Sequence, residues 1–209
     1  FSISNQGGQD INVANIYPAN MKLWLDANHS SASGSTWTDR SGSGNDATKN
    51  GTPSVISNAQ NGLPIMRYAG TNGHYHSFNR ISDIRTVFLV AKYSGGYGYV
   101  LGDTGAYNFH GNGSAAIFHS GHASASIRSS DMFYKNGTAY NKYGAWGASL
   151  SIFSLVTDGN VQANNFSNDR NYNGRCFNGD MTELIIYNKN LSLEEVQMVE
   201  GYLAHKWGL

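Results

Sequence analysis

The middle of the sequence interleaves aromatic rings with imidazole and amide groups. Sugars present C–H faces that stack on aromatic rings, and hydroxyl groups that pair with neutral polar side chains. This composition favours contact with a glycan, although a simpler interpretation places about half of the rings in the core. The candidate ligand-binding residues of this stretch are Tyr97, Tyr99, Tyr107, Asn108, His110, Asn112, His119 and His122.

His74 and His76 join these candidates because residues two apart in a strand share one face. A zinc site could combine such a pair with His119 or His122. The sequence has no Cys/His or His-x-x-x-His spacing that supports zinc. Hydrogen bonding on a polar face is therefore the simpler role for these imidazoles.

Aspartates in loops rich in glycine and asparagine indicate a hard cation. Calcium binds several oxygen atoms, which carboxylates and carbonyls in such loops supply. We expect one structural calcium ion, with Asp26, Asp39, Asp103 and Asp180 as candidate ligands. The alternative is that these aspartates only form turns, as the Ser-Gly that follows closely after Asp39 would allow.

Catalytic carboxylates are hard to find. A glycosidase places two of them about 5–10 Å apart. Three of the four glutamates lie near the carboxyl end and Glu183 stands alone, so no strand carries carboxylates at every second residue. A pair assembled only by folding, such as Asp103 with Asp131, remains an alternative. We expect a binding function rather than an enzyme, and keep glycan hydrolysis as a lesser alternative.

Strands must position these side chains. Apolar and polar residues alternate over short runs that Gly, Asn and Ser clusters separate, which is typical of an all-β sandwich. The predicted strands are Met21–Asp26, Pro64–Tyr68, Tyr75–Phe78, Thr86–Tyr93, Tyr97–Leu101, Tyr107–His110, Ala115–His119, Met132–Lys135, Ser151–Thr157 and Met181–Tyr187.

The carboxyl end has a helical period instead. Ser192 and Glu195 have the spacing of a capping box, which satisfies free amides at a helix start. Apolar residues then recur at steps of three and four up to Trp207, and Gly208 stands where a helix ends. We expect one amphipathic helix packed on the sandwich.

The length and composition of the chain limit the number of domains and the classes of partner. A chain of 209 residues fits one domain, which we place at 21–209 after a linker or edge segment at 1–20. Only 13 % of residues are charged, the formal net charge is zero and no basic run occurs, so we expect no nucleic-acid partner. No apolar stretch reaches the roughly 18 residues that span a bilayer. The single Cys176 excludes an internal disulfide.

Two segments resemble laminin-G-like domains of the concanavalin A-like superfamily. One comprises Leu23-Trp24-Leu25-Asp26 and the stretch from Trp37 to Ala47, and the other runs from Phe177 to Asn188 and on through the helix to Gly208. The resemblance implies a jelly roll of two curved antiparallel sheets, in which a structural calcium is common. It implies less about function, because this fold serves lectins, adhesins, glycanases and spacers.

The sequence thus predicts an all-β, two-sheet antiparallel jelly-roll sandwich with one carboxyl-terminal amphipathic helix. We expect a lectin-like module of a secreted adhesin, phage fibre or carbohydrate-active protein, located outside the cell or on a cell or virion surface. Its expected partner is a glycan or cell-surface polysaccharide, alongside other protein chains of a larger assembly. The alternative is a structural or decoration domain that binds mainly protein. Exposed rings along one concave face favour the first role, and buried rings favour the second.

Overall fold

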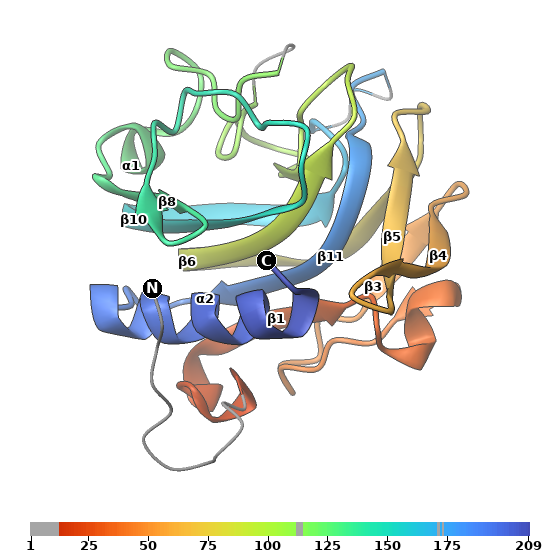
Figure 1. Cartoon of the computed structure of the whole chain (residues 1–209). Coiled ribbons are helices and arrows are strands. Elements are labelled where there is room, and N and C mark those ends of the chain that lie inside the picture. The colour runs from red at the N-terminus through yellow and green to blue at the C-terminus, as the bar shows by residue number, and fades with distance from the viewer. Residues whose placement is uncertain (1–12, 112–114, 171, 173) are drawn as a thin grey trace.

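The computed structural model describes residues 13–111, 115–170, 172 and 174–209. Within them, eleven strands form one hydrogen-bonded antiparallel network, and one long helix follows at the carboxyl end (Figure 1). The predicted all-β antiparallel fold with a carboxyl-terminal helix is confirmed. The strands are β1 (Met21–Asp26), β2 (Thr36–Trp37), β3 (Ala47–Asn50), β4 (Ser54–Gln60), β5 (Leu63–Ala69), β6 (Tyr75–Tyr93), β7 (Leu101–Gly102), β8 (Met132–Lys135), β9 (Thr138–Ala139), β10 (Ser151–Phe166) and β11 (Asn178–Tyr187).

Two long strands, β6 and β10, organise the sheet. The strand order is β4-β5-β11-β6-β10-β8-β9, with β1 paired to β11, β3 to β6 and β7 to β10. The sequence predicted two separate strands where β6 runs unbroken over 19 residues. No Gly or Pro interrupts residues 79–85, so nothing in that stretch ends the strand. Register shifts between Val156 and Asn165 of β10 let the paired strands bend.

The core lies on both sides of β11. Its residues Leu184, Ile185 and Ile186 are fully buried, as the unbroken apolar run predicts for a strand covered on both faces. Strands β1, β5 and β6 all pair with β11. At the amino end of the described chain, Val13 in a short 3₁₀ helix (Val13–Asn15) is also part of the buried core.

The carboxyl-terminal helix α2 (Leu193–Trp207) begins and ends where the sequence predicts. Ser192 Oγ accepts from the Glu195 amide at 3.3 Å, and Glu195 Oε2 accepts from the Ser192 amide at 2.7 Å. Gly208 ends the helix in the left-handed conformation, with φ +66°. Val196, Val199, Leu203 and Trp207 of the apolar stripe are fully buried, whereas Leu193 at its start is exposed. In Figure 1 the helix runs along one side of the curved strands β6 and β11.

A buried carboxylate fastens α2 to the sheet. Glu183 of β11 accepts hydrogen bonds from Trp24 Nε1 at 2.6 Å, Tyr202 hydroxyl at 2.9 Å, Lys206 Nζ at 2.8 Å and Trp207 Nε1 at 2.8 Å. Burial raises the pKa of Glu183, and the neighbouring Lys206 opposes that rise. The four donors come from β1 and α2, so the first strand, the last strand and the helix meet at one group.

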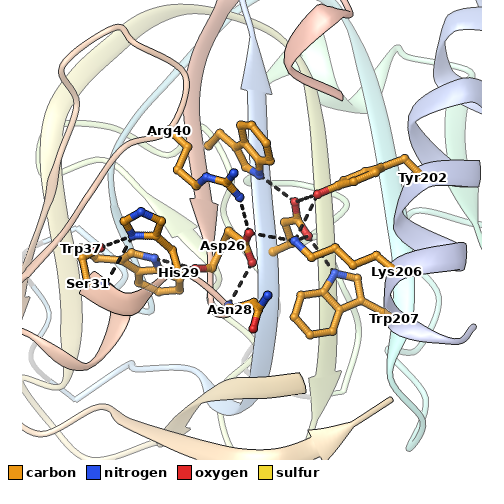
Figure 2. A network of polar contacts seen from close by, with 11 residues as sticks. Asp26, Asn28, His29, Ser31, Trp37, Arg40, Tyr202, Lys206 and Trp207 are labelled. Carbon is orange, nitrogen blue, oxygen red and sulfur yellow. Dashed lines mark hydrogen bonds and ion pairs between the residues drawn. The ribbon is translucent and has the colours of Figure 1, made fainter. Parts of the chain in front are cut away.

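Asp26 extends this network to the following loop. Lys206 Nζ also lies 2.8 Å from Asp26 Oδ2, and Arg40 pairs with the same oxygen (Figure 2). The guanidinium of Arg40 in turn lies 4.0 Å from the ring centroid of Trp24. Two buried anions and two cations thus neutralise one another, which buried charges require.

The described chain between β7 and β8 is mostly irregular, and in Figure 1 it lies on the side of the sheet opposite α2. The predicted strands Tyr97–Leu101, Tyr107–His110 and Ala115–His119 are wrong, apart from Leu101 in β7. The described backbone of this region bonds within loops instead, for example from the His119 amide to the His110 carbonyl at 2.9 Å. One short helix, α1 (Ala125–Arg128), occurs there. None of the helices in the described ranges has the length and apolar character that crossing a membrane requires.

Candidate functional site

One pocket is walled almost entirely by rings and cations. It has a volume of about 390 Å³ and lies where the irregular chain after β6 meets the segment between β10 and β11. We call it the aromatic pocket. Its lining residues are Tyr97, Tyr99, Tyr107, His110, His119, His122, Arg170, Tyr172 and Arg175.

Close backbone contacts fix the loops that carry these side chains. A Cβ at Gly111 would stand 3.0 Å from the Gly98 carbonyl oxygen, so the two chain segments approach closely where glycine is present. The hydrogen bond between His119 and His110 then holds two of the imidazole-bearing residues side by side. The side chains that line this pocket therefore come from loops rather than from strands.

The wall begins with a stack of rings and a guanidinium. The rings of His119 and His122 are 4.4 Å apart between centroids, and His122 stacks on Tyr107 at 5.8 Å with an interplanar angle of 28°. The guanidinium of Arg170 follows, 3.9 Å from the Tyr107 centroid and 4.4 Å from that of Tyr172. Contacts of this kind combine stacking with cation–π attraction.

The stack continues on the far side of Arg170. Arg175 lies 4.8 Å from the centroid of Tyr172 and 5.9 Å from that of Tyr99. Tyr99 and Tyr97 follow with centroids 5.9 Å apart. Each of the two guanidinium groups therefore lies between tyrosine rings along the wall.

A buried carboxylate beneath the wall holds the two arginines. The side chain of Asp169 is 5 % exposed, and its oxygens lie 2.9 Å from Arg175 Nη1 and 3.2 Å from Arg170 Nε. Burial alone would raise the pKa of Asp169, but interactions with His110, Arg170 and Arg175 outweigh it and lower the pKa to about 2. His110 Nδ1 lies 3.5 Å from Asp169 Oδ1, too long and poorly directed for a full hydrogen bond.

The tautomer of His119 follows from its backbone neighbours. Its Nδ1 accepts from the amides of Gly121 at 3.0 Å and His122 at 3.2 Å, so the ring proton lies on Nε2. Partial burial lowers the pKa of His119, as do the nearby His122 and His110, which favours this neutral donor form. A metal ligand would need Nε2 unprotonated. Among the described residues, no group of three or more His, Cys, Asp or Glu side chains is arranged to hold a metal ion.

Six of the predicted ligand-binding residues line the aromatic pocket: Tyr97, Tyr99, Tyr107, His110, His119 and His122. Asn108 follows Tyr107 directly and accepts the Ser124 amide at its carbonyl, without lining the pocket. Asn112 lies outside the described residues.

His74 and His76 lie elsewhere. His76 is fully buried, with Nδ1 2.7 Å from the Tyr68 hydroxyl and its ring edge-on to Trp37. Burial, with a smaller contribution from Lys49, lowers the pKa of His76 to about 4. His74 Nδ1 lies 3.4 Å from Thr52 Oγ1. The alternation that placed these two on one face did not bring them to the aromatic pocket.

The sequence did not identify Asp169, Arg170, Tyr172 or Arg175 as site residues. They lie in a segment with no periodic pattern, which begins three residues after the end of β10. The available signal was charge: two arginines beside an aspartate in a chain with 13 % charged residues. Their meeting with Tyr107 depends on the fold, because more than 60 residues separate Tyr107 from Arg170.

Three of the predicted calcium ligands already have cationic partners. Asp26 pairs with Arg40 and Lys206, and Asp103 pairs with Arg80 at 2.7 Å. Asp180 binds Arg67 through both oxygens, at 2.7 and 3.0 Å.

Asp39, the fourth predicted calcium ligand, organises its own turn. It accepts the amides of Trp24, Ser41 and Asn45 at 2.9 Å each. This matches the turn-forming alternative for Asp39. A structural calcium ion stays a prediction, and it would have to compete with these contacts.

Two further pockets are less aromatic. One of about 370 Å³ adjoins Asn168, whose Nδ2 donates to the Arg170 carbonyl at 2.9 Å; it is lined by Tyr75, Ser77, Phe78, Thr104, Asn164, Asn165 and Asn168. Another of about 360 Å³ lies beside β5 and contains the Arg67–Asp180 pair. Neither has the stacked wall of the aromatic pocket.

The aromatic pocket can stack on a ligand and donate hydrogen bonds to it. Its rings offer apolar faces, and the guanidinium groups and the His119 imidazole offer N–H donors. No aspartate or glutamate is among its lining residues, so it does not present the facing carboxylate pair that glycoside hydrolysis uses. Searches with this chain against protein-family models, curated proteins and solved structures returned no match.

Proposed function

We propose that this domain is a non-catalytic carbohydrate-binding module and that the aromatic pocket is its binding site. One observation carries the proposal. Five tyrosines are exposed among the described residues, and three of them, Tyr97 at 41 %, Tyr107 at 48 % and Tyr172 at 52 %, line this one pocket. Large rings that gather at the surface indicate a binding site more strongly than rings scattered singly.

The chemistry of the pocket suits a sugar. Exposed rings stack on the C–H faces of a pyranose, while neutral and cationic donors pair with its hydroxyl groups. The volume of about 390 Å³ lies within the range of about 300–1,000 Å³ usual for small-ligand sites. Because the arginines are held by Asp169 and by stacking, the pocket is largely formed before a ligand arrives.

The proposal includes a setting. The domain would belong to the concanavalin A-like superfamily, as a laminin-G-like unit of an adhesin, phage fibre or carbohydrate-active protein. It would act outside the cell or on a cell or virion surface, where glycans are the available ligands. The resemblance of the two chain ends, the low charge and the polar loops support this setting.

A structural or decoration role that binds mainly protein is the second candidate. It is favoured by the many rings that are buried in the core and unavailable to a ligand, among them Trp37, Trp146 and Phe177. The two roles differ in what the exposed rings of the aromatic pocket contact. Hydrolysis of the bound glycan is a lesser alternative.

A broad glycan array of the purified domain tests the proposal, run with calcium and again with chelator. We expect selective binding that Tyr107→Ala abolishes and Tyr140→Ala preserves, because Tyr140 is 37 % exposed but does not line the pocket. A blank array from folded protein would refute glycan binding and direct the search to protein partners. Release of shorter products from the bound glycan would instead show an enzyme.

A further inference from the structure

We infer that the saccharide bound in the aromatic pocket is acidic, with a carboxylate or sulfate group held by Arg170 and Arg175. This inference rests on the proposed function and narrows it to a chemical class. It depends on the charge, the remaining donors and the orientation of these two side chains.

The pocket is cationic in a chain that is neutral overall. Its lining contains two guanidinium groups and no carboxylate, while Asp169 beneath it supplies one negative charge. The site therefore keeps one net positive charge, whereas the formal net charge of the whole chain is zero. A neutral sugar would leave this charge without a partner, and an acidic sugar would neutralise it.

Asp169 does not use up the donors of the two arginines. It accepts from Nε and Nη2 of Arg170 and from Nη1 of Arg175. A guanidinium carries five N–H groups, so both side chains keep further donors. The neutral His119, with its proton on Nε2, adds another donor to the same pocket.

Tyrosine rings flank these guanidinium groups and restrict their movement. Arg170 lies against both Tyr107 and Tyr172, and Arg175 lies against Tyr172. A guanidinium stacked on a ring directs its N–H groups along its own edge, where a planar carboxylate or a sulfate accepts two parallel bonds. Fixed cations of this kind lose little side-chain entropy on binding.

The test compares a charged glycan with its uncharged form and adds a sulfated glycan. Hexagalacturonate carries carboxylates, its fully methyl-esterified form has the same rings without them, and a carrageenan hexasaccharide carries sulfate on neutral sugars. These probes are read by calorimetry beside an array that contains uronate, sialate, sulfated and neutral glycans. We expect acidic glycans to bind at least ten times more tightly than their uncharged counterparts, with affinity that falls as salt rises.

Arginine variants test whether the preference for acidic glycans arises in the aromatic pocket. Arg175→Gln should weaken the preferred acidic glycan about tenfold or more and leave its uncharged counterpart nearly unaffected. Arg67→Gln is the matched control, since Arg67 also pairs a half-exposed guanidinium with a buried aspartate but lines another pocket. If Arg175→Gln does not fold, the comparison of charged and esterified glycans on the unaltered domain still decides the question.

The outcomes separate the two proposals. Tight binding of neutral glycans with no preference for charge would overturn the acidic ligand and leave the carbohydrate-binding function standing. A blank array would refute both. Preference across the array for uronates and sialates over sulfated glycans identifies the anion as a carboxylate, and the reverse preference identifies it as a sulfate.

Discussion

Asp26 and Glu183 lie opposite each other in β1 and β11 and share one ammonium group. Lys206 Nζ is 2.8 Å from Asp26 Oδ2 and 2.8 Å from Glu183 Oε2. Two carboxylates this close, with 2 % and 0 % exposed surface, require a cation between them. Lys206 therefore ties the last turn of α2 to the first and the last strand of the sheet.

Removing that cation should be costly. Lys206→Met leaves two buried carboxylates without their shared partner, and we expect a loss of about 3–5 kcal/mol in the free energy of unfolding, measured by urea denaturation. Lys189→Met is the control, because Lys189 pairs with Glu195 at 3.0 Å near the surface and should cost at most about 1 kcal/mol. Equal losses in the two variants would contradict a central role for Lys206.

His76 should make the fold sensitive to mild acid. Its pKa is about 4 in the folded protein against 6.5 ordinarily, so between these values the unfolded chain binds more protons. The free energy of unfolding then falls as pH drops from about 6.5 to 4, by up to about 1.4 kcal/mol per pH unit and about 3 kcal/mol in total. Denaturation curves at pH 7 and pH 4.5 measure the fall.

His76→Gln keeps a hydrogen-bonding group but removes the titrating imidazole. The free energy of unfolding of this variant should therefore fall less over this pH range than that of the unaltered protein. His205→Gln, at an exposed position on α2, serves as control and should not change the slope. An unchanged slope in His76→Gln would show that other groups govern the acid sensitivity.

Asp169 should titrate far below an ordinary aspartate. With the pKa lowered from 3.8 to about 2, its ionised form contributes stability above about pH 4, and this contribution is lost as pH falls towards 2. We expect Asp169→Asn to lower the free energy of unfolding by about 2 kcal/mol at pH 7. Carbon-13 NMR of the Asp169 carboxyl group measures its titration directly. The control Asp158→Asn, at an exposed position, should change the free energy of unfolding little.

Gly102 should be needed for the position of the arginine-bearing segment. A Cβ there would stand 2.0 Å from the Asn168 carbonyl oxygen, directly before Asp169. The constraint is space, since Gly102 has no left-handed φ. Gly102→Ala should therefore cost about 1–3 kcal/mol or more and weaken glycan binding.

Gly174→Ala provides the contrast to Gly102→Ala. Its Cβ would meet nothing closer than Asn72 Oδ1 at 3.9 Å, although it lies beside Arg175. The amide chemical shifts of Asp169 and Arg170 and the midpoint temperature of thermal unfolding should change in the Gly102 variant only. If both variants behave alike, the close approach to Asn168 does not control the site.

The sequence by itself determined the elements whose signals are local. Strand β1, the apolar run of β11 and the capped helix α2 follow from neighbours two to four residues apart, and each appears where predicted. It also pointed to the rings and imidazoles of the aromatic pocket, because their types indicate stacking and hydrogen bonding. The two segments that carry the laminin-G-like resemblance turned out to hold the Asp26–Glu183–Lys206 cluster.

Tertiary structure alone decided what those side chains contact. Tyr107 meets Arg170 across 63 positions of the sequence, and Lys206 meets Asp26 across 180. No short-range pattern encodes such pairs. The same alternation appears in β1 and around Tyr97–Tyr99, yet only β1 finds a partner strand along its length. An aspartate can form a turn, pair with an arginine or face a ligand, and the distant segment that packs beside it decides which. The reason is that a buried charge is tolerated only where a partner lies within bonding distance.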